Sequence, residues 1–188
     1  MTDSPALESL RQNPQLNELD AGTPNRAAAD QLESAAANLD RLFSPHAIAD
    51  REMAEACLAG LWLLHDFLDE SHRISQNLDN PTGSLWHGIM HRREGDFSNA
   101  KYWFCRVGNH PVYVPLGDAA RELAAADDDP ATAFLRKQTR WDPNPFVDLC
   151  QRSLASSSKH NLLCRQLQRK EWELLFEFCF GRAIGRER

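Results

Sequence analysis

The stretch "CLAGLWLL", residues 57 to 64, is apolar at almost every position. It belongs to a longer segment whose apolar residues recur at the spacing of a helix: Met53, Cys57, Leu61, Leu64 and Leu68. Trp62, Leu63 and Phe67 widen this stripe until little of the helix circumference is polar. A helix of this kind is expected in the middle of a helical bundle. The apolar run is too short to span a bilayer, which needs about 20 apolar residues.

Helical periodicity extends over most of the remaining chain. With the helix at 45–78, the pattern predicts helices at 24–43, 84–95, 100–107, 116–127, 130–139, 145–155 and 159–181. The "VYV" within "NHPVYVPLGD" favours a few extended residues, and one such run does not make a sheet. The fold class is therefore all-α, a single-domain helical bundle of about eight helices. We expect the helix 45–78 and the last helix to be the most buried.

The two ends of the chain differ in composition from its middle. Residues 1–23 are rich in polar residues and proline without sustained periodicity, which predicts a flexible leader with a short helical piece near Leu7. Residues 24–182 form the predicted helical domain, and 183–188 a short basic tail.

Composition excludes several classes of function. The formal net charge is −6 and no basic block is present, which disfavours nucleic-acid binding. The first twenty residues lack the layout of a signal peptide, and no segment is predicted to enter a membrane. The five cysteines are odd in number and show no CxxC spacing, which is typical of buried thiols in a reducing compartment. We therefore expect a cytoplasmic protein.

Small and aromatic residues between Gly88 and Pro111 follow a helical-hairpin pattern. Gly88 stands in the first helix, and the later positions are Gly95, Asp96 and Phe97 in the turn, Ala100 and Phe104 in the second helix, and Pro111 at the end. This pattern resembles a single tetratricopeptide (TPR)-type or Sel1-like unit, which implies two closely packed antiparallel helices. A shift by the 34-residue repeat length finds no second copy, so one TPR-like hairpin inside a bundle is expected.

Three longer segments carry a second resemblance. "LHDFLDESHRISQ" (64–76), "HRREGDFSNAKYWF" (91–104) and "EWELLFEFC" (171–179) resemble an uncharacterised family of bacterial proteins. That family has no assigned activity, so the resemblance implies a folded domain and no particular chemistry.

Ionisable residues gather on one face of two neighbouring predicted helices. They are His65, Asp69 and His72 in the first helix, and His87, His91 and Glu94 in the second. The short connection at 79–83 predicts antiparallel packing of 45–78 and 84–95. At about 1.5 Å of rise per residue, His72 then lies level with His91, and Asp69 level with Glu94. If the two faces meet, Asp69, His72, His91 and Glu94 could hold a divalent transition metal.

Two other interpretations of this cluster stay open. The same residues could form a structural network of hydrogen bonds and ion pairs. Alternatively, Arg92 and Arg93 could form a pocket for a small molecule or an anion, since guanidinium groups compete for carboxylates and repel a cation. The "HGIMH" stretch is not a metalloprotease motif, because Gly88 stands where the general-base glutamate is required.

The sequence therefore favours a binding module over an enzyme. The preferred hypothesis is a helical protein without a cofactor that binds a protein or small-molecule partner through the 62–111 region. The expected contact residues are His65, Arg92, Arg93, Tyr102 and Arg106. The alternative is a metal-dependent, hydrolase-like enzyme with its site between 45–78 and 84–95, and a homo-oligomer is a further interpretation.

Overall fold

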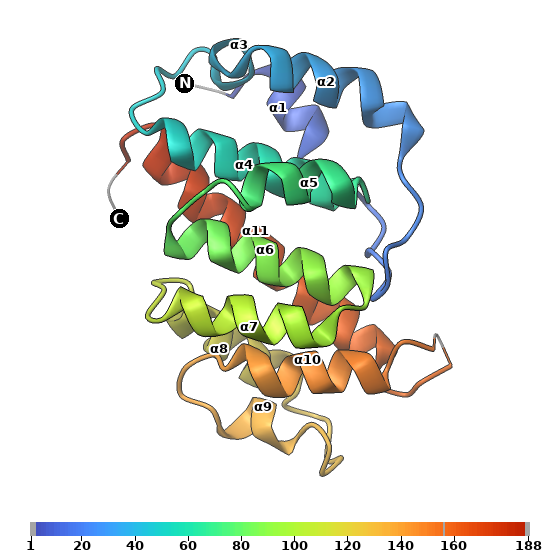
Figure 1. Ribbon diagram of the computed structural model, residues 1–188. Helices are drawn as coiled ribbons and strands as arrows, with labels where there is room; N and C mark the ends of the chain where they lie inside the picture. The colour runs from blue at the N-terminus through green and yellow to red at the C-terminus, as the bar shows by residue number, and fades with distance from the viewer. Residues whose placement is uncertain (1–2, 156, 187–188) are drawn as a thin grey trace.

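The computed structural model describes residues 3–155 and 157–186. Within these ranges the chain forms eleven α-helices and one short 3-10 helix, with no β-strand (Figure 1). The predicted all-α fold class is confirmed, although the helices are shorter and more numerous than expected. Among the described helices, none combines the length and the apolar character that crossing a membrane requires.

The helices stack one beside the next along the molecule. In chain order they are α1 (Pro5–Leu10), η1 (Arg26–Ala28), α2 (Ala29–Ala37), α3 (Leu39–Phe43), α4 (Arg51–Leu64), α5 (Leu68–Ser75), α6 (Pro81–Glu94), α7 (Phe97–Val107), α8 (Tyr113–Leu123), α9 (Ala133–Lys137), α10 (Pro143–Arg152) and α11 (Asn161–Ala183). Figure 1 shows α11 running diagonally behind the stack of α4, α6 and α7. The long last helix therefore ties the N-terminal and C-terminal halves together.

The prediction of one continuous helix over 45–78 is wrong. The helix begins only at Arg51, where the Asp50 side chain accepts a hydrogen bond from the Met53 backbone amide at 3.1 Å. It then breaks after Leu64, because Asp66 adopts a left-handed backbone with φ of 63° and α5 starts afresh at Leu68. Apolar spacing carries on across the break, so periodicity alone did not reveal it. Because of the break, residues of α4 and α5 that have the spacing of one helix need not lie on the same face.

Other boundaries differ for similar local reasons. The predicted helix 24–43 is divided at Asn38, whose side chain caps α3 by accepting from the Arg41 backbone amide at 2.9 Å. The "VYV" run is not extended: α8 begins at Tyr113, whose side chain is buried. The intrinsic preference of these residues for strand or helix is a weak guide to their conformation, and burial of α8 against the bundle favours the helix.

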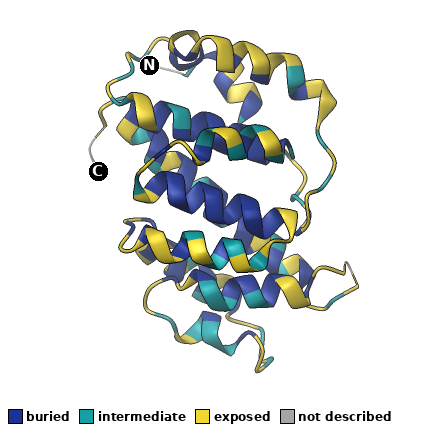
Figure 2. Ribbon diagram, in the orientation of Figure 1, coloured by how far each residue is buried: buried dark blue, intermediate teal, exposed yellow. Residues whose placement is uncertain are grey.

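The most buried helices are α4 and, against expectation, α6. Figure 2 shows α6 dark blue along nearly its whole length. Gly60 of α4 leaves room for the Trp86 ring of α6, since a Cβ there would lie 2.7 Å from that ring. Gly88 of α6 in turn leaves room for the Phe104 ring of α7, from which a Cβ would again lie only 2.7 Å away. These two close approaches place α6 in the centre of the stack, between α4 and α7.

The segment expected to be a flexible leader is instead packed against the bundle. From Asp3 onward its leucines at 7, 10 and 19 are buried. Side chains of α11 donate to its backbone carbonyls: Arg165 Nε to Asn17 O at 3.0 Å, and Arg169 Nη1 to Asn13 O at 2.8 Å. We call residues 11–25 the strap. At the other end α11 continues to Ala183, and residues 187–188 of the predicted basic tail lie outside the described residues.

Candidate metal centre

Three histidines from two neighbouring helices come together on one side of the stack. His72 lies on α5, and His87 and His91 lie one turn apart on α6. One ring nitrogen from each lies within 4.8 Å of the others. The His87 and His91 rings are stacked with centroids 4.6 Å apart, and the His72 ring lies edge-on to His87 at 4.7 Å. The i, i+4 spacing on α6 and the short turn after α5 produce this cluster.

His87 is the least satisfied member of the cluster. Its side chain is buried, and neither ring nitrogen has a hydrogen-bond partner among the described residues. Burial, followed by the neighbouring His91 and His72, lowers the pKa of His87 to about 3. The imidazole is therefore neutral at neutral pH and keeps a nitrogen lone pair. Other buried groups of the described residues also lack a partner, but His87 lacks one at both ring nitrogens, and a ligand bound to one of them would satisfy it.

His91 is held in one orientation by its neighbours. Its Nδ1 lies 2.5 Å from Glu94 Oε1, so the ring donates a hydrogen bond to that carboxylate. This tautomer leaves a lone pair on Nε2, which accepts from Asn99 Nδ2 at 3.1 Å. A metal-binding histidine commonly donates its other nitrogen to a carboxylate in this way. A metal at Nε2 would take the place of the Asn99 amide.

The predicted set of metal ligands is only partly brought together. His72 and His91, which the sequence placed at the same height, do meet, and Glu94 reaches the cluster through His91. Asp69 is exposed and lies outside the three-histidine group, because the break at Asp66 sets the start and rotation of α5. His87 takes the place of Asp69 in the group. The i, i+4 spacing of the two histidines in "HGIMH" indicates His87, but the predicted ligands were chosen by their height along the helices instead.

Arg92 has a structural role and is not available to a partner. It is fully buried on α6, and its guanidinium contacts the equally buried Glu171 of α11 at 2.5 Å and 3.3 Å. Its Cζ also lies 4.7 Å from the centre of the Phe146 ring. The expectation that Arg92 binds a ligand is therefore corrected, since it joins α6 to α11 inside the core.

Arg93 and His65 hold the strap and the end of α1 in place. Arg93 is buried, pairs with Asp66 at 2.7 Å and donates from Nε to the Asp20 carbonyl at 2.8 Å. His65 is also buried, with Nε2 2.9 Å from the Leu10 carbonyl oxygen and Nδ1 3.0 Å from the Asn25 amide nitrogen. Neither residue reaches the surface as a contact residue was expected to.

Tyr102 and Arg106 on α7 do lie at the surface. Tyr102 is 55% exposed, and the Arg106 side chain is 47% exposed. The Arg106 Cζ lies 5.2 Å from the ring centre of Trp103, and Trp103 stacks on His87 with ring centres 4.0 Å apart. Two of the five predicted contact residues are thus exposed beside the histidine cluster.

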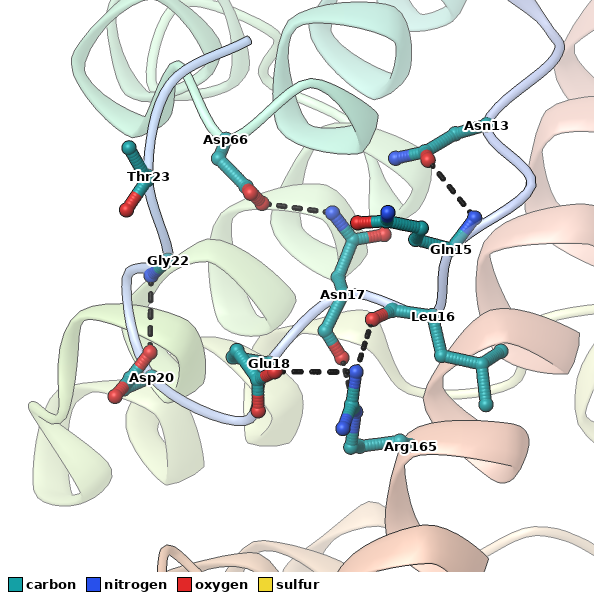
Figure 3. Close-up of a pocket in the computed structure, with 10 residues that line it drawn as sticks. All are labelled: Asn13, Gln15, Leu16, Asn17, Glu18, Asp20, Gly22, Thr23, Asp66 and Arg165. Carbon is teal, nitrogen blue, oxygen red and sulfur yellow. Dashed lines mark hydrogen bonds and ion pairs between the residues drawn. The ribbon is translucent and has the colours of Figure 1, made fainter. Parts of the chain in front are cut away.

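A polar pocket of about 420 Å³ lies elsewhere, between the strap, Asp66 and Arg165 (Figure 3). Its lining groups contact one another: Asn17 Nδ2 donates to Asp66 at 2.7 Å, and Arg165 pairs with Glu18 at 3.2 Å. Since these groups already satisfy each other, the pocket offers less reason for a ligand than the histidine cluster, where His87 has no partner among the described residues.

His110 gives a prediction on the pH dependence of stability. It is buried with Nε2 3.1 Å from the Thr82 hydroxyl, and burial lowers its pKa to about 4. The unfolded chain, with a histidine pKa near 6.5, binds the proton more readily. Stability is therefore present above pH 6.5 and is lost as the pH falls toward 4, by about 3 kcal/mol from this group. Urea unfolding at pH 7 and pH 4.5 should show a smaller difference in His110→Gln than in the wild type, and equal differences would contradict this.

Three clustered imidazoles offer a defined chemistry. Neutral imidazole is a common ligand of zinc, and three protein ligands leave a fourth position for water or substrate. Metal-bound water is acidic enough to act as a nucleophile near neutral pH.

Comparison of the chain with family models, curated proteins and solved structures found no match.

Proposed function

We propose that the protein is a zinc-dependent hydrolase whose metal is held by His72, His87 and His91. The observation that carries the proposal is the buried His87, which has no hydrogen-bond partner within the described residues and lies between two further imidazoles. This develops the metal-enzyme alternative from the sequence and makes the 62–111 region the ligand-binding part of the molecule. Asp69, one of the metal ligands expected from the sequence, is not a ligand in this proposal.

The number of ligands favours catalysis over a structural zinc. Structural zinc sites use four protein ligands, whereas catalytic sites use three and keep one open position. The group contains three histidines, which leaves a fourth position for a non-protein ligand, and the partly exposed His72 connects the group to the surface. Glu94 would act as a positioning residue by accepting from His91 Nδ1 and orienting the ring.

The cluster would hold zinc after its rings turn, because the His87 and His91 rings are stacked with an interplanar angle of 20° and their nearly parallel nitrogen lone pairs must be directed at one position. Zinc–nitrogen bonds of about 2.0–2.1 Å in a tetrahedral site require nitrogens about 3.3 Å apart. The three nitrogens lie within 4.8 Å of one another, so rotation of the partly exposed His72 ring would bring them closer. The neutral state of His87 removes the need to displace a proton from that ring.

The test combines zinc content with a hydrolysis assay. After equilibrium dialysis, the wild type is expected to retain about one zinc per chain and to hydrolyse p-nitrophenyl acetate faster than the zinc-free protein. His72→Ala should lose both properties, because His72 is a proposed ligand, and its partly exposed position lies outside the buried core. A His46→Ala variant, altered at a histidine that pairs with Asp3, should keep both. Zinc-independent hydrolysis, or full zinc retention by His72→Ala, would refute the proposal.

A further inference from the structure

One face of α7 runs alongside the histidine cluster. Asn99, Trp103 and Arg106 are spaced i, i+4 and i+7, so they share that face. Asn99 contacts the His91 ring at 3.1 Å, and the Trp103 ring stacks on His87 at 4.0 Å with an interplanar angle of 15°. Arg106 extends this row by one turn. The row leads from the proposed zinc ligands to a guanidinium group at the surface.

The Arg106 guanidinium is held in place but poorly neutralised. It lies 5.2 Å from the centre of the Trp103 ring and 6.0 Å from that of Tyr102. Two aromatic neighbours restrict its position through cation–π attraction. Its acidic neighbour is Asp79, at 3.8 Å and with a fully exposed side chain. Such a long, exposed ion pair contributes little to stability, so the guanidinium group is free to bind another anion.

Arg92 and Arg93, which follow His91 on α6, cannot take this role. Arg92 is occupied by Glu171, and Arg93 by Asp66 and backbone carbonyls of the strap. A zinc held by three neutral imidazoles also carries a net positive charge, since none of its three ligands is a carboxylate and Glu94 lies behind His91. The metal and Arg106 would thus form two separated positive positions, both adjacent to the Trp103 ring.

We infer that the zinc centre acts on small substrates that carry an anionic group, which Arg106 binds at a distance from the reacting end. This inference rests on the proposed zinc site. The substrate class is an ester or amide of a short carboxylic acid with a second carboxylate a few bonds away. The planar guanidinium group donates two parallel hydrogen bonds to a carboxylate, which makes Arg106 selective for a carboxylate over a neutral group. The ligand would reach from the metal past the edge of Trp103 to Arg106.

The experiment uses product-like acids as probes of cobalt-loaded protein. Cobalt(II) replaces zinc in tetrahedral sites and gives visible absorption bands that shift when an acid enters the open position. Succinate has carboxylates at both ends, and succinamate has the same length with one end neutral. The wild type is expected to bind succinate about tenfold more tightly than succinamate, which corresponds to one charge-assisted contact.

Two variants identify the source of the preference. Arg106→Gln should bind both acids with similar affinity. Arg51→Gln, altered at an exposed arginine of α4 that pairs with Asp40, should keep the tenfold preference. Absence of cobalt bands in the wild type would refute the zinc site and this inference together. Cobalt bands with equal succinate and succinamate affinities, or a preference that survives in Arg106→Gln, would refute the inference alone.

Discussion

Replacing Glu171 by glutamine is expected to lower the free energy of unfolding by about 3–5 kcal/mol, as loss of one partner of a buried ion pair does. Glu171 and Arg92 are both fully buried, and their contacts at 2.5 Å and 3.3 Å join α11 to α6. Glutamine keeps the shape of the side chain but leaves the Arg92 charge without a counter-charge in the core. Urea unfolding monitored by circular dichroism measures the difference.

Two controls separate the charge effect from general damage. Glu173→Gln removes an exposed partner of Lys170 on the same helix and should change stability by no more than about 0.5 kcal/mol. The double variant Arg92→Met/Glu171→Leu replaces the pair by apolar groups and should be more stable than Glu171→Gln. A Glu171→Gln protein as stable as Glu173→Gln would show that the pair does not hold α6 against α11.

Replacing His87 by glutamine is expected to weaken zinc binding by at least about 100-fold. Loss of a residue that only orients a zinc ligand costs about 10- to 100-fold, and His87 is proposed to be a ligand itself. Glu94→Gln, which changes the partner of His91, should fall within that smaller range. Calorimetric titration with zinc measures both affinities. His46→Gln, remote from the cluster, should bind like the wild type, and unchanged affinity in His87→Gln would exclude this residue as a ligand.

The sequence predicted the fold class from the periodicity of its apolar residues. The apolar run at 57–64 does lie in a buried central helix, and α11 does pack against it. Helix breaks were harder, because a single left-handed residue such as Asp66 leaves the apolar spacing on both sides intact. The strap was missed for another reason. Its backbone carbonyls are bound by arginines of α11 about 150 positions away, and local composition carries no trace of such contacts.

The sequence indicated which helices carry the histidines, but not which side chains would come together. The spacing of the histidines and the short turn placed His72 and His91 at the same height on neighbouring helices, and in the structure their ring centres lie 5.3 Å apart. Whether a polar residue on α6 faces the cluster or the core depends on the rotation of the helix, which spacing does not determine. Arg92 therefore turned out to be buried against Glu171, and His87 to be the central member of the cluster.

X-ray absorption at the zinc edge tests the proposed metal site most directly. For the zinc-loaded wild type we expect three imidazole nitrogens at about 2.0–2.1 Å, one further light ligand and no sulfur. His87→Gln and His72→Ala should each lose one imidazole or fail to retain zinc. A spectrum with sulfur ligands, with fewer than three imidazoles, or unchanged in both variants would contradict the assignment of His72, His87 and His91 as the metal site.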